Sequence, residues 1–321
     1  MGGGLVVSRP NDRTKVLYVL GLQRGGTTIL SRAIGVMEGF EFAGELRRLW
    51  VQGLQQGRVC GCGKPHAECE IWSRVLDADL RFGGLTASNI ADLQRYVVPT
   101  SHSWRHTLKL IRATNPLDAP AREYAQIVSD LYRSFAEAAS AQIVVDSSKH
   151  PGDPALLARA GDAKLYCLHV VRDPRGSVFS KHKRNARGGV SQAHILSTIY
   201  GTGAWLTRHL TSDAVQRRYG ESRSMLVRFE DFVREPAATL RAIRDLVGST
   251  AQVPEFRPGE TLRLATSHPP AGNGNFASTE VVIRSEEEWR SALNPIDRIA
   301  ATAVALPALS KYGYSVMNGP V

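Results

Sequence analysis

The chain has 321 residues, of which 43% are hydrophobic and 22% are charged, and its formal net charge is +10. This composition supplies enough apolar residues for a packed core and excludes a chain that is disordered throughout. Four cysteines in a chain of this length exclude a disulfide-stabilised scaffold. No apolar run reaches the ~20 residues of a membrane span, and residues 1–10 hold no signal-peptide core, so we expect a cytoplasmic protein without a membrane span.

Arginine supplies most of the positive charge, with 32 Arg and 8 Lys in the chain. The guanidinium fork suits phosphate and sulfate oxygens, and a basic balance also fits nucleic acid or an anionic membrane surface. Aromatic residues make up 7% of the chain and do not interleave with the basic cluster at residues 172–187, as a nucleic-acid surface would require. We therefore expect a small anionic ligand and no nucleic-acid partner.

Short apolar runs alternate with helical segments along the chain. This alternation predicts an α/β fold, a P-loop-like, doubly wound parallel sheet that helices cover on both faces. We expect one domain over residues 1–321, with a mostly helical insertion at residues 53–141. Ligands of such sheets bind beyond the carboxyl ends of the strands. The expected elements are strands at residues 15–21, 142–146, 164–171 and 225–229, and helices at residues 28–37, 122–141 and 192–219.

A glycine-rich loop follows the first expected strand. It reads Gly-Leu-Gln-Arg-Gly-Gly-Thr-Thr over residues 21–28 and precedes an expected helix. Glycines let backbone N–H groups approach an anion closely, and the helix dipole adds a favourable field. The glycines fit a Walker A loop, but Thr27 replaces the lysine that triphosphate chemistry requires. The loop therefore predicts a phosphate site that has Arg24 as its cation.

A second basic cluster follows the expected strand at residues 164–171. Arg172 ends this strand, and Ser180 and Arg184 are four residues apart, so the latter two share one helix face. Together the three side chains can hold one phosphate. Two anion sites at strand ends suit a nucleotide with charges on both sides of its ribose, and 3′-phosphoadenosine-5′-phosphosulfate (PAPS) is such a nucleotide.

These motifs resemble those of the PAPS-dependent sulfotransferases, most closely the tyrosylprotein sulfotransferase type and related bacterial enzymes. Residues 24–28 are similar to their 5′-phosphosulfate loop, and Arg172 with Ser180 is similar to their 3′-phosphate motif. The resemblance implies PAPS as the co-substrate and 3′-phosphoadenosine-5′-phosphate (PAP) as the product. The nucleotide-binding residues that it implies are Arg24, Gly25, Gly26, Thr27, Thr28, Arg172, Ser180, Arg184 and Arg284.

The same resemblance implies roles in the reaction. A Gly-Glu pair about twenty residues after the loop arginine puts the catalytic base on Glu45. Lys149 and Arg24 are placed to stabilise the transition state, and Ser278 takes the position of a catalytic serine. Phe229 stands where a nucleotide-contacting tyrosine is expected. Because the sulfuryl donor is already activated, we expect no metal in the reaction.

The sequence thus predicts an enzyme that transfers the sulfuryl group of PAPS to a hydroxyl of a small-molecule, lipid or glycan acceptor. An amine acceptor stays open, and so do the identity of the acceptor and the oligomeric state. One alternative is a P-loop kinase or NTPase with a degenerate Walker A loop, which would need ATP and magnesium. Another is a non-catalytic nucleotide- or nucleic-acid-binding module, in which Glu45 and Lys149 would point away from the ligand.

Three cysteines and a histidine lie within ten residues, at Cys60, Cys62, His66 and Cys69. Such a cluster fits a zinc site, a redox-labile disulfide or simple packing in a tight loop. Structural zinc sites commonly use two CxxC pairs, and the chain has no second pair. Loop packing is therefore the favoured interpretation of the three.

Overall fold

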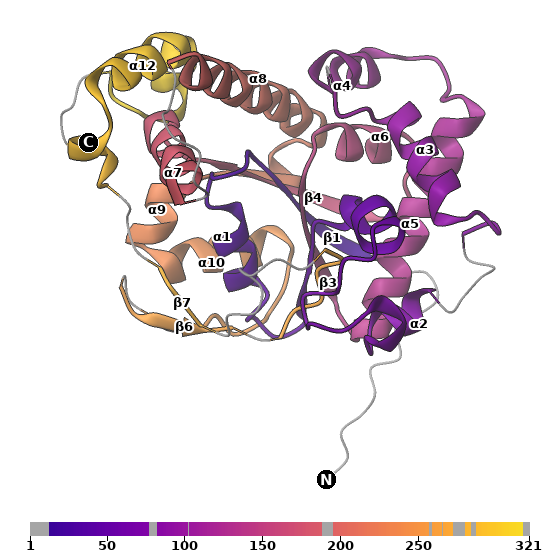
Figure 1. Ribbon diagram of the computed structural model, residues 1–321. Coiled ribbons are helices and arrows are strands. Elements are labelled where there is room, and N and C mark those ends of the chain that lie inside the picture. The colour runs from indigo at the N-terminus through magenta and orange to yellow at the C-terminus, as the bar shows by residue number, and fades with distance from the viewer. Residues whose placement is uncertain are drawn as a thin grey trace.

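The computed structural model describes residues 13–76, 82–101, 103–187, 195–256, 259–264, 266–271, 280–283 and 287–316. Within these residues, five strands form one parallel sheet in the order β2-β3-β1-β4-β5 (Figure 1). A separate antiparallel pair joins β6 to β7. The strands are β1 (Lys15–Leu20), β2 (Phe40–Gly44), β3 (Ile143–Lys149), β4 (Lys164–Val171), β5 (Ser224–Arg228), β6 (Thr261–Arg263) and β7 (Glu280–Val282).

Helices fill most of the chain between the strands. Short single-turn or irregular helices are η1 (Leu46–Arg48), η2 (Leu49–Gln55), η3 (His66–Glu68), η4 (Glu221–Arg223) and η5 (Ser310–Tyr312). The α-helices are α1 (Thr27–Ile34), α2 (Trp72–Leu76), α3 (Ala87–Val97), α4 (Ser103–Arg112), α5 (Ala119–Ala139), α6 (Gly152–Ala160), α7 (Pro174–Arg187), α8 (Ile195–Tyr219), α9 (Phe229–Arg234), α10 (Pro236–Leu246), α11 (Trp289–Ala292) and α12 (Pro295–Leu309).

The side chains of the central strand β1 alternate between two apolar layers. Val16 and Tyr18 are fully buried in a cluster that includes apolar residues of α5 and α6. Leu17 and Val19 are fully buried in a second cluster, which includes apolar residues of α1 and α10. Figure 1 shows α5 and α6 on one side of the sheet and α1 and α10 on the other. Helices on both faces of a parallel sheet confirm the predicted α/β fold class.

The four strands predicted from apolar runs are present as β1, β3, β4 and β5. The sequence did not indicate β2, an edge strand that pairs with β3 in parallel, with Phe40 opposite Ile143. The first helix ends at Ile34, three residues before the predicted end, and Gly35 supplies its C-cap. The helix expected at residues 192–219 corresponds to α8, in the part of it that is described.

Between β2 and β3, the described residues form helices, turns and loops and contain no strand. Here α2 and α3 pack on α5, and α3 also packs on η2, whereas α4 packs on α6 and α8; α5 also contacts β2 and β3. The division into one domain with an insertion at residues 53–141 stays a prediction. None of the helices in the described parts of the chain is long and apolar enough to cross a membrane.

Candidate active site

A cavity of about 570 Å³ opens beyond the carboxyl ends of the parallel strands. Its wall includes the loop after β1, residues that follow β2 and β3, and parts of α7 and α8. Glu45 is the single carboxylate among the described residues that line it. An excess of cations over one carboxylate suits an anionic ligand. The cationic side chains of the lining are Arg24, Arg47, Arg48, Lys149, Lys181, Arg184 and Arg208.

The predicted phosphate loop forms the turn between β1 and α1, and its first half, Gly21 to Arg24, lines the cavity. Gly26 has φ +79°, and a Cβ atom built on it would lie 2.0 Å from the ring of Phe229. This position therefore requires glycine twice, for its backbone conformation and for its lack of a side chain. Thr27 is buried beneath the loop at the start of α1, where free backbone N–H groups and the helix dipole favour an anion.

Glu45 and Lys149 meet at the edge of this cavity, although they are 104 residues apart in the chain. Glu45 directly follows β2, and Lys149 is the last residue of the neighbouring strand β3. Lys149 Nζ lies 3.0 Å from Glu45 Oε1, and Arg48 Nε lies 2.7 Å from Glu45 Oε2. Parallel pairing of β2 and β3 thus brings the predicted base next to the predicted stabilising cation.

Two cationic residues of the site have left-handed backbone conformations, Arg24 with φ +69° and Lys149 with φ +63°. Residues other than glycine adopt this region at a cost of roughly 1–3 kcal/mol, so the surrounding structure must hold them there. Burial lowers the pKa of Lys149, while the charge of Glu45 and its hydrogen bond act in the opposite direction. Such strain and such a perturbed pKa are typical of functional sites.

Arg172 connects the two predicted anion sites. Its Nη1 donates to the backbone carbonyl oxygen of Arg24 at 3.2 Å, and its guanidinium lies 5.1 Å from the ring centroid of Phe229. Its own carbonyl oxygen accepts a hydrogen bond from Trp205 Nε1 at 2.9 Å. Phe229, where a nucleotide-contacting tyrosine was expected, is a buried residue that packs against Gly26 and Arg172.

Helix α7 presents one face to the cavity. Ser177, Lys181 and Arg184 line it, at intervals of four and three residues, which places them on one side of the helix. Ser180 does not line this cavity and is only partly buried. Of the two α7 residues that were predicted to hold a phosphate, Arg184 therefore belongs to the described cavity wall, and the role of Ser180 stays a prediction.

The sequence of residues 17–252 matches the model of the Sulfotransferase family. The chain belongs to the sulfotransferase family. This match covers the loop after β1, Glu45, Lys149 and the segment around Arg172. The closer likeness to the tyrosylprotein type, which the sequence motifs suggested, stays a prediction.

Three solved structures of bacterial sulfotransferases are similar to this one, at low identity. The sulfotransferase of Alicyclobacillus acidocaldarius has 15% identity and a TM-score of 0.43, over 95% of each chain. The sulfotransferase domain of the curacin biosynthetic pathway has 13% identity and a TM-score of 0.47, over 95% of this chain and 99% of its own. The sulfotransferase domain of the Synechococcus PCC 7002 olefin synthase has 17% identity and a TM-score of 0.44, over 95% of this chain and 98% of its own.

No curated protein sequence matches the chain. The family assignment depends on the sequence match alone.

The site of this sulfotransferase includes cations that sequence reasoning missed. Arg208 of α8 lines the cavity, and its Nη1 donates to the carbonyl oxygen of Lys149 at 3.0 Å. Burial lowers the pKa of Arg208. Arg47 also lines the cavity and forms an ion pair with Asp153 at 2.6 Å. No motif signals Arg208, because it lies in the middle of a long helix, 59 residues from Lys149.

Two predicted site residues of the sulfotransferase, Ser278 and Arg284, lie outside the described residues. Their roles stay predictions from the sequence.

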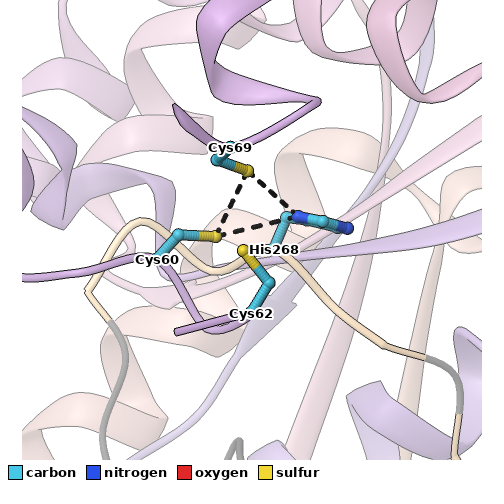
Figure 2. A group of neighbouring side chains, drawn as sticks. All are labelled: Cys60, Cys62, Cys69 and His268. Atoms are coloured by element: carbon cyan, nitrogen blue, oxygen red, sulfur yellow. Dashed lines mark hydrogen bonds between the residues drawn. The ribbon is translucent and has the colours of Figure 1, made fainter. Parts of the chain in front are cut away.

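The cysteine cluster is not part of the cavity lining, and the histidine that joins it in the structure is not the one that the sequence suggested. Cys60, Cys62 and Cys69 come together with His268 (Figure 2), whereas His66 packs edge-on against Trp72 at a centroid distance of 5.7 Å. His66, which the sequence grouped with the three cysteines, is therefore not among the four donors that the structure brings together.

Proposed function

We propose that the protein transfers the sulfuryl group of PAPS to an acceptor hydroxyl. The observation that carries this proposal is the contact between Glu45 and Lys149 at 3.0 Å, in a cationic cavity beside the loop after β1. A hydroxyl acceptor needs a base, and a leaving phosphate needs a cation. The described lining offers Glu45 as its single carboxylate, next to cations that suit the second role.

The nucleotide would be held by the groups that the motifs single out. Backbone N–H groups of Gly26, Thr27 and Thr28, at the start of α1, suit the 5′-phosphosulfate, and the N–H of Gly25 shapes the loop by donating to the carbonyl oxygen of Leu22. On the far side of the ribose, Arg172 with Ser180 and Arg184 suits the 3′-phosphate. The hydrogen bond from Arg172 to the carbonyl oxygen of Arg24 supports a single nucleotide that both sites hold together.

In the reaction, a bond forms between the acceptor oxygen and sulfur while the bond from sulfur to the bridging phosphate oxygen breaks. Glu45 takes the proton of the acceptor hydroxyl, and PAP leaves with the electron pair of the broken bond. Lys149 and Arg24 stabilise the negative charge that grows on the bridging oxygen. Lys149 pairs with Glu45, so an incoming negative charge would compete for Lys149 and free the carboxylate to act as a base.

The acceptor belongs on the side of the cavity formed by the segments between β2 and β3. Val51 and Gln52 of η2, together with Gln94 and Thr100, give that side neutral side chains. Its two cations, Arg47 and Arg48, are paired with Asp153 and Glu45. A wall of neutral side chains and paired cations beside a cationic nucleotide site suits a hydroxyl-bearing small molecule, lipid or glycan. Triphosphate transfer is the poorer explanation. Thr27 replaces the loop lysine, and the one carboxylate in the described lining already pairs with Lys149 and Arg48, which makes it a poor magnesium ligand.

Calorimetry with PAP in the absence of metal tests the nucleotide, against ATP with magnesium as the alternative ligand. We expect PAP to bind to the wild-type protein. Arg172→Ala should weaken that binding about tenfold or more, because it removes at least one charge-assisted hydrogen bond to the nucleotide. Lys183→Ala is the matched control, because this exposed lysine of α7 pairs with Glu288 away from the cavity. Binding of ATP with magnesium and no binding of PAP would overturn the proposal. PAP release from PAPS in the presence of candidate acceptors then tests the transfer itself.

A further inference from the structure

Three thiols and one imidazole converge behind the active site, from two segments far apart in the chain. Cys60 and Cys62 lie in the loop after η2, and Cys69 directly follows η3. His268 comes from the segment after β6, 199 residues beyond Cys69. Figure 2 shows the three sulfur atoms and the His268 ring directed toward one another. Cys60, Cys69 and His268 are buried and Cys62 is partly buried, so the donors face one another largely away from solvent.

The separations that join Cys60, Cys69 and His268 are close to the edges of a metal-centred tetrahedron. The Sγ atoms of Cys60 and Cys69 lie 3.6 Å apart, and His268 Nδ1 lies 3.2 Å and 3.7 Å from the Sγ atoms of Cys69 and Cys60. All four donor atoms, including the Sγ of Cys62, lie within 4.8 Å of one another. Zinc–sulfur bonds of about 2.3 Å and zinc–nitrogen bonds of about 2.0 Å give tetrahedral edges of about 3.5–3.8 Å.

Hydrogen bonds to backbone carbonyl oxygens hold the two segments in this arrangement. Trp72 Nε1 donates to the carbonyl oxygen of His268 at 2.8 Å, and the N–H of Gly61 donates to the carbonyl oxygen of Pro269 at 3.0 Å. On its far side, the His268 ring has Nε2 3.7 Å from a carboxylate oxygen of Glu70. A carboxylate near the outer nitrogen of a ligating histidine is a common feature of zinc sites, because it fixes the orientation of the ring.

We propose that Cys60, Cys62, Cys69 and His268 form a structural zinc site. Three thiolates and one imidazole in tetrahedral arrangement are a known ligand set of structural zinc, and four protein donors leave no open position for a substrate. Simple packing does not explain why a histidine from a distant segment turns Nδ1 toward two sulfurs. A disulfide between Cys60 and Cys69 would need their sulfurs at about 2.05 Å, well inside the observed 3.6 Å.

The site has a consequence for the cavity, because the segment that carries His268 also packs behind the predicted base. Gly44 has φ +77°, and a Cβ atom built on it would lie 2.2 Å from Cβ of Pro269. Gly44 directly precedes Glu45. A metal that fixes His268 therefore also fixes Pro269 against the end of β2. Through this contact the zinc site would position Glu45, without touching the substrate itself.

Metal analysis of the wild-type protein, purified without chelator, tests the proposal directly. We expect one zinc per chain, and stoichiometric zinc release when a mercurial reagent blocks the thiols. Cobalt substituted for zinc should give the intense visible bands of a tetrahedral site and a thiolate-to-cobalt charge-transfer band. These measurements need no variant, so they do not depend on whether a ligand variant folds.

Two histidine variants make a matched pair, because both side chains are buried and His66 is the histidine that lies near the cysteines in sequence. His268→Ala should lose most of the bound zinc and the cobalt bands, whereas His66→Ala should keep them. Cys167→Ser, in β4 and away from the cluster, should also keep them. The proposal is overturned if the wild-type protein neither contains zinc nor takes it up from solution, or if non-reducing peptide mapping finds Cys60 joined to Cys69. It is equally overturned if His268→Ala retains one zinc per chain.

Discussion

Arg208 donates a hydrogen bond from Nη1 to the backbone carbonyl oxygen of Lys149, over 3.0 Å. The bond joins the middle of α8 to the end of β3, at a residue whose backbone is left-handed. The guanidinium also lines the cavity, so Arg208 both adds a charge there and supports the conformation that directs Lys149 toward Glu45.

Arg208→Ala should therefore lower kcat/KM for sulfuryl transfer by about 10- to 100-fold, since a small displacement of a catalytic group has effects of that size. Steady-state kinetics with PAPS measure this. Calorimetry with PAP then separates two causes: the loss of a charge weakens nucleotide binding, whereas the displacement of Lys149 lowers the rate. Arg218→Ala is the control, because Arg218 is an exposed residue of the same helix. An Arg208→Ala enzyme with unchanged kinetics would show that Lys149 keeps its position without this bond.

Glu45→Gln should lower kcat by about 10²–10⁴-fold, the range for removal of a general base. Binding of PAP should be unchanged or tighter, because the substitution removes a negative charge from a cavity that otherwise holds cations. This opposite response of kcat and affinity is not expected of a variant that merely folds poorly.

Rate measurements and PAP titrations on the same Glu45→Gln preparation check both parts. Glu38→Gln changes an exposed glutamate close to the start of β2 and should alter neither quantity. If Glu45→Gln keeps its rate, another group takes the proton.

The sequence predicted the core of the fold because four of the five strands of the main sheet contain a continuous apolar run. It did not indicate β2, which has five residues, includes Glu41, follows Gly39 and ends in Gly44. Such a segment has little strand preference of its own, and pairing with β3 stabilises it. Desolvation raises the pKa of Glu41 to about 7, as expected for a carboxyl group that tertiary packing has buried.

Local motifs predicted the candidate site where the chemistry lies within one segment, as in the loop after β1. They could not show contacts between segments that only the tertiary fold brings together, such as Arg208 with Lys149. The same limit applies to the cysteine cluster. Spacing grouped His66 with the cysteines, because it is near them in sequence, whereas the folded chain brings the distant His268 to the sulfurs, and Trp72 donates a hydrogen bond to its backbone.

The activity should fall at alkaline pH as Lys149 loses its proton. Burial lowers the pKa of Lys149 below the ordinary 10.5, because desolvation disfavours the ammonium form, and Glu45 only partly offsets this. If the cationic form is the active one, kcat/KM stays level below the lowered pKa and falls as pH rises through it. The fall should therefore begin at a lower pH than an ordinary lysine would give.

The profile of kcat/KM reports the free enzyme, so bound nucleotide does not distort this measurement. Lys149→Arg replaces the ammonium with a group that stays charged over the whole accessible range. Whatever its absolute rate, this variant should lose the alkaline fall. An identical fall in both enzymes would assign it to another group.

Gly26→Ala should destabilise the protein and weaken PAP binding, because the new Cβ atom meets the ring of Phe229 at 2.0 Å. Gly57→Ala is the matched control for backbone strain, since Gly57 has φ +64° and nothing within 4 Å of its Cβ position. The control should cost roughly 1–2 kcal/mol of unfolding free energy, the penalty for a left-handed residue with a side chain. Gly26→Ala should cost about 1–3 kcal/mol more, as overpacking does. Urea unfolding measures both values, and equal losses in the two variants would mean that Phe229 can move away from the loop without cost.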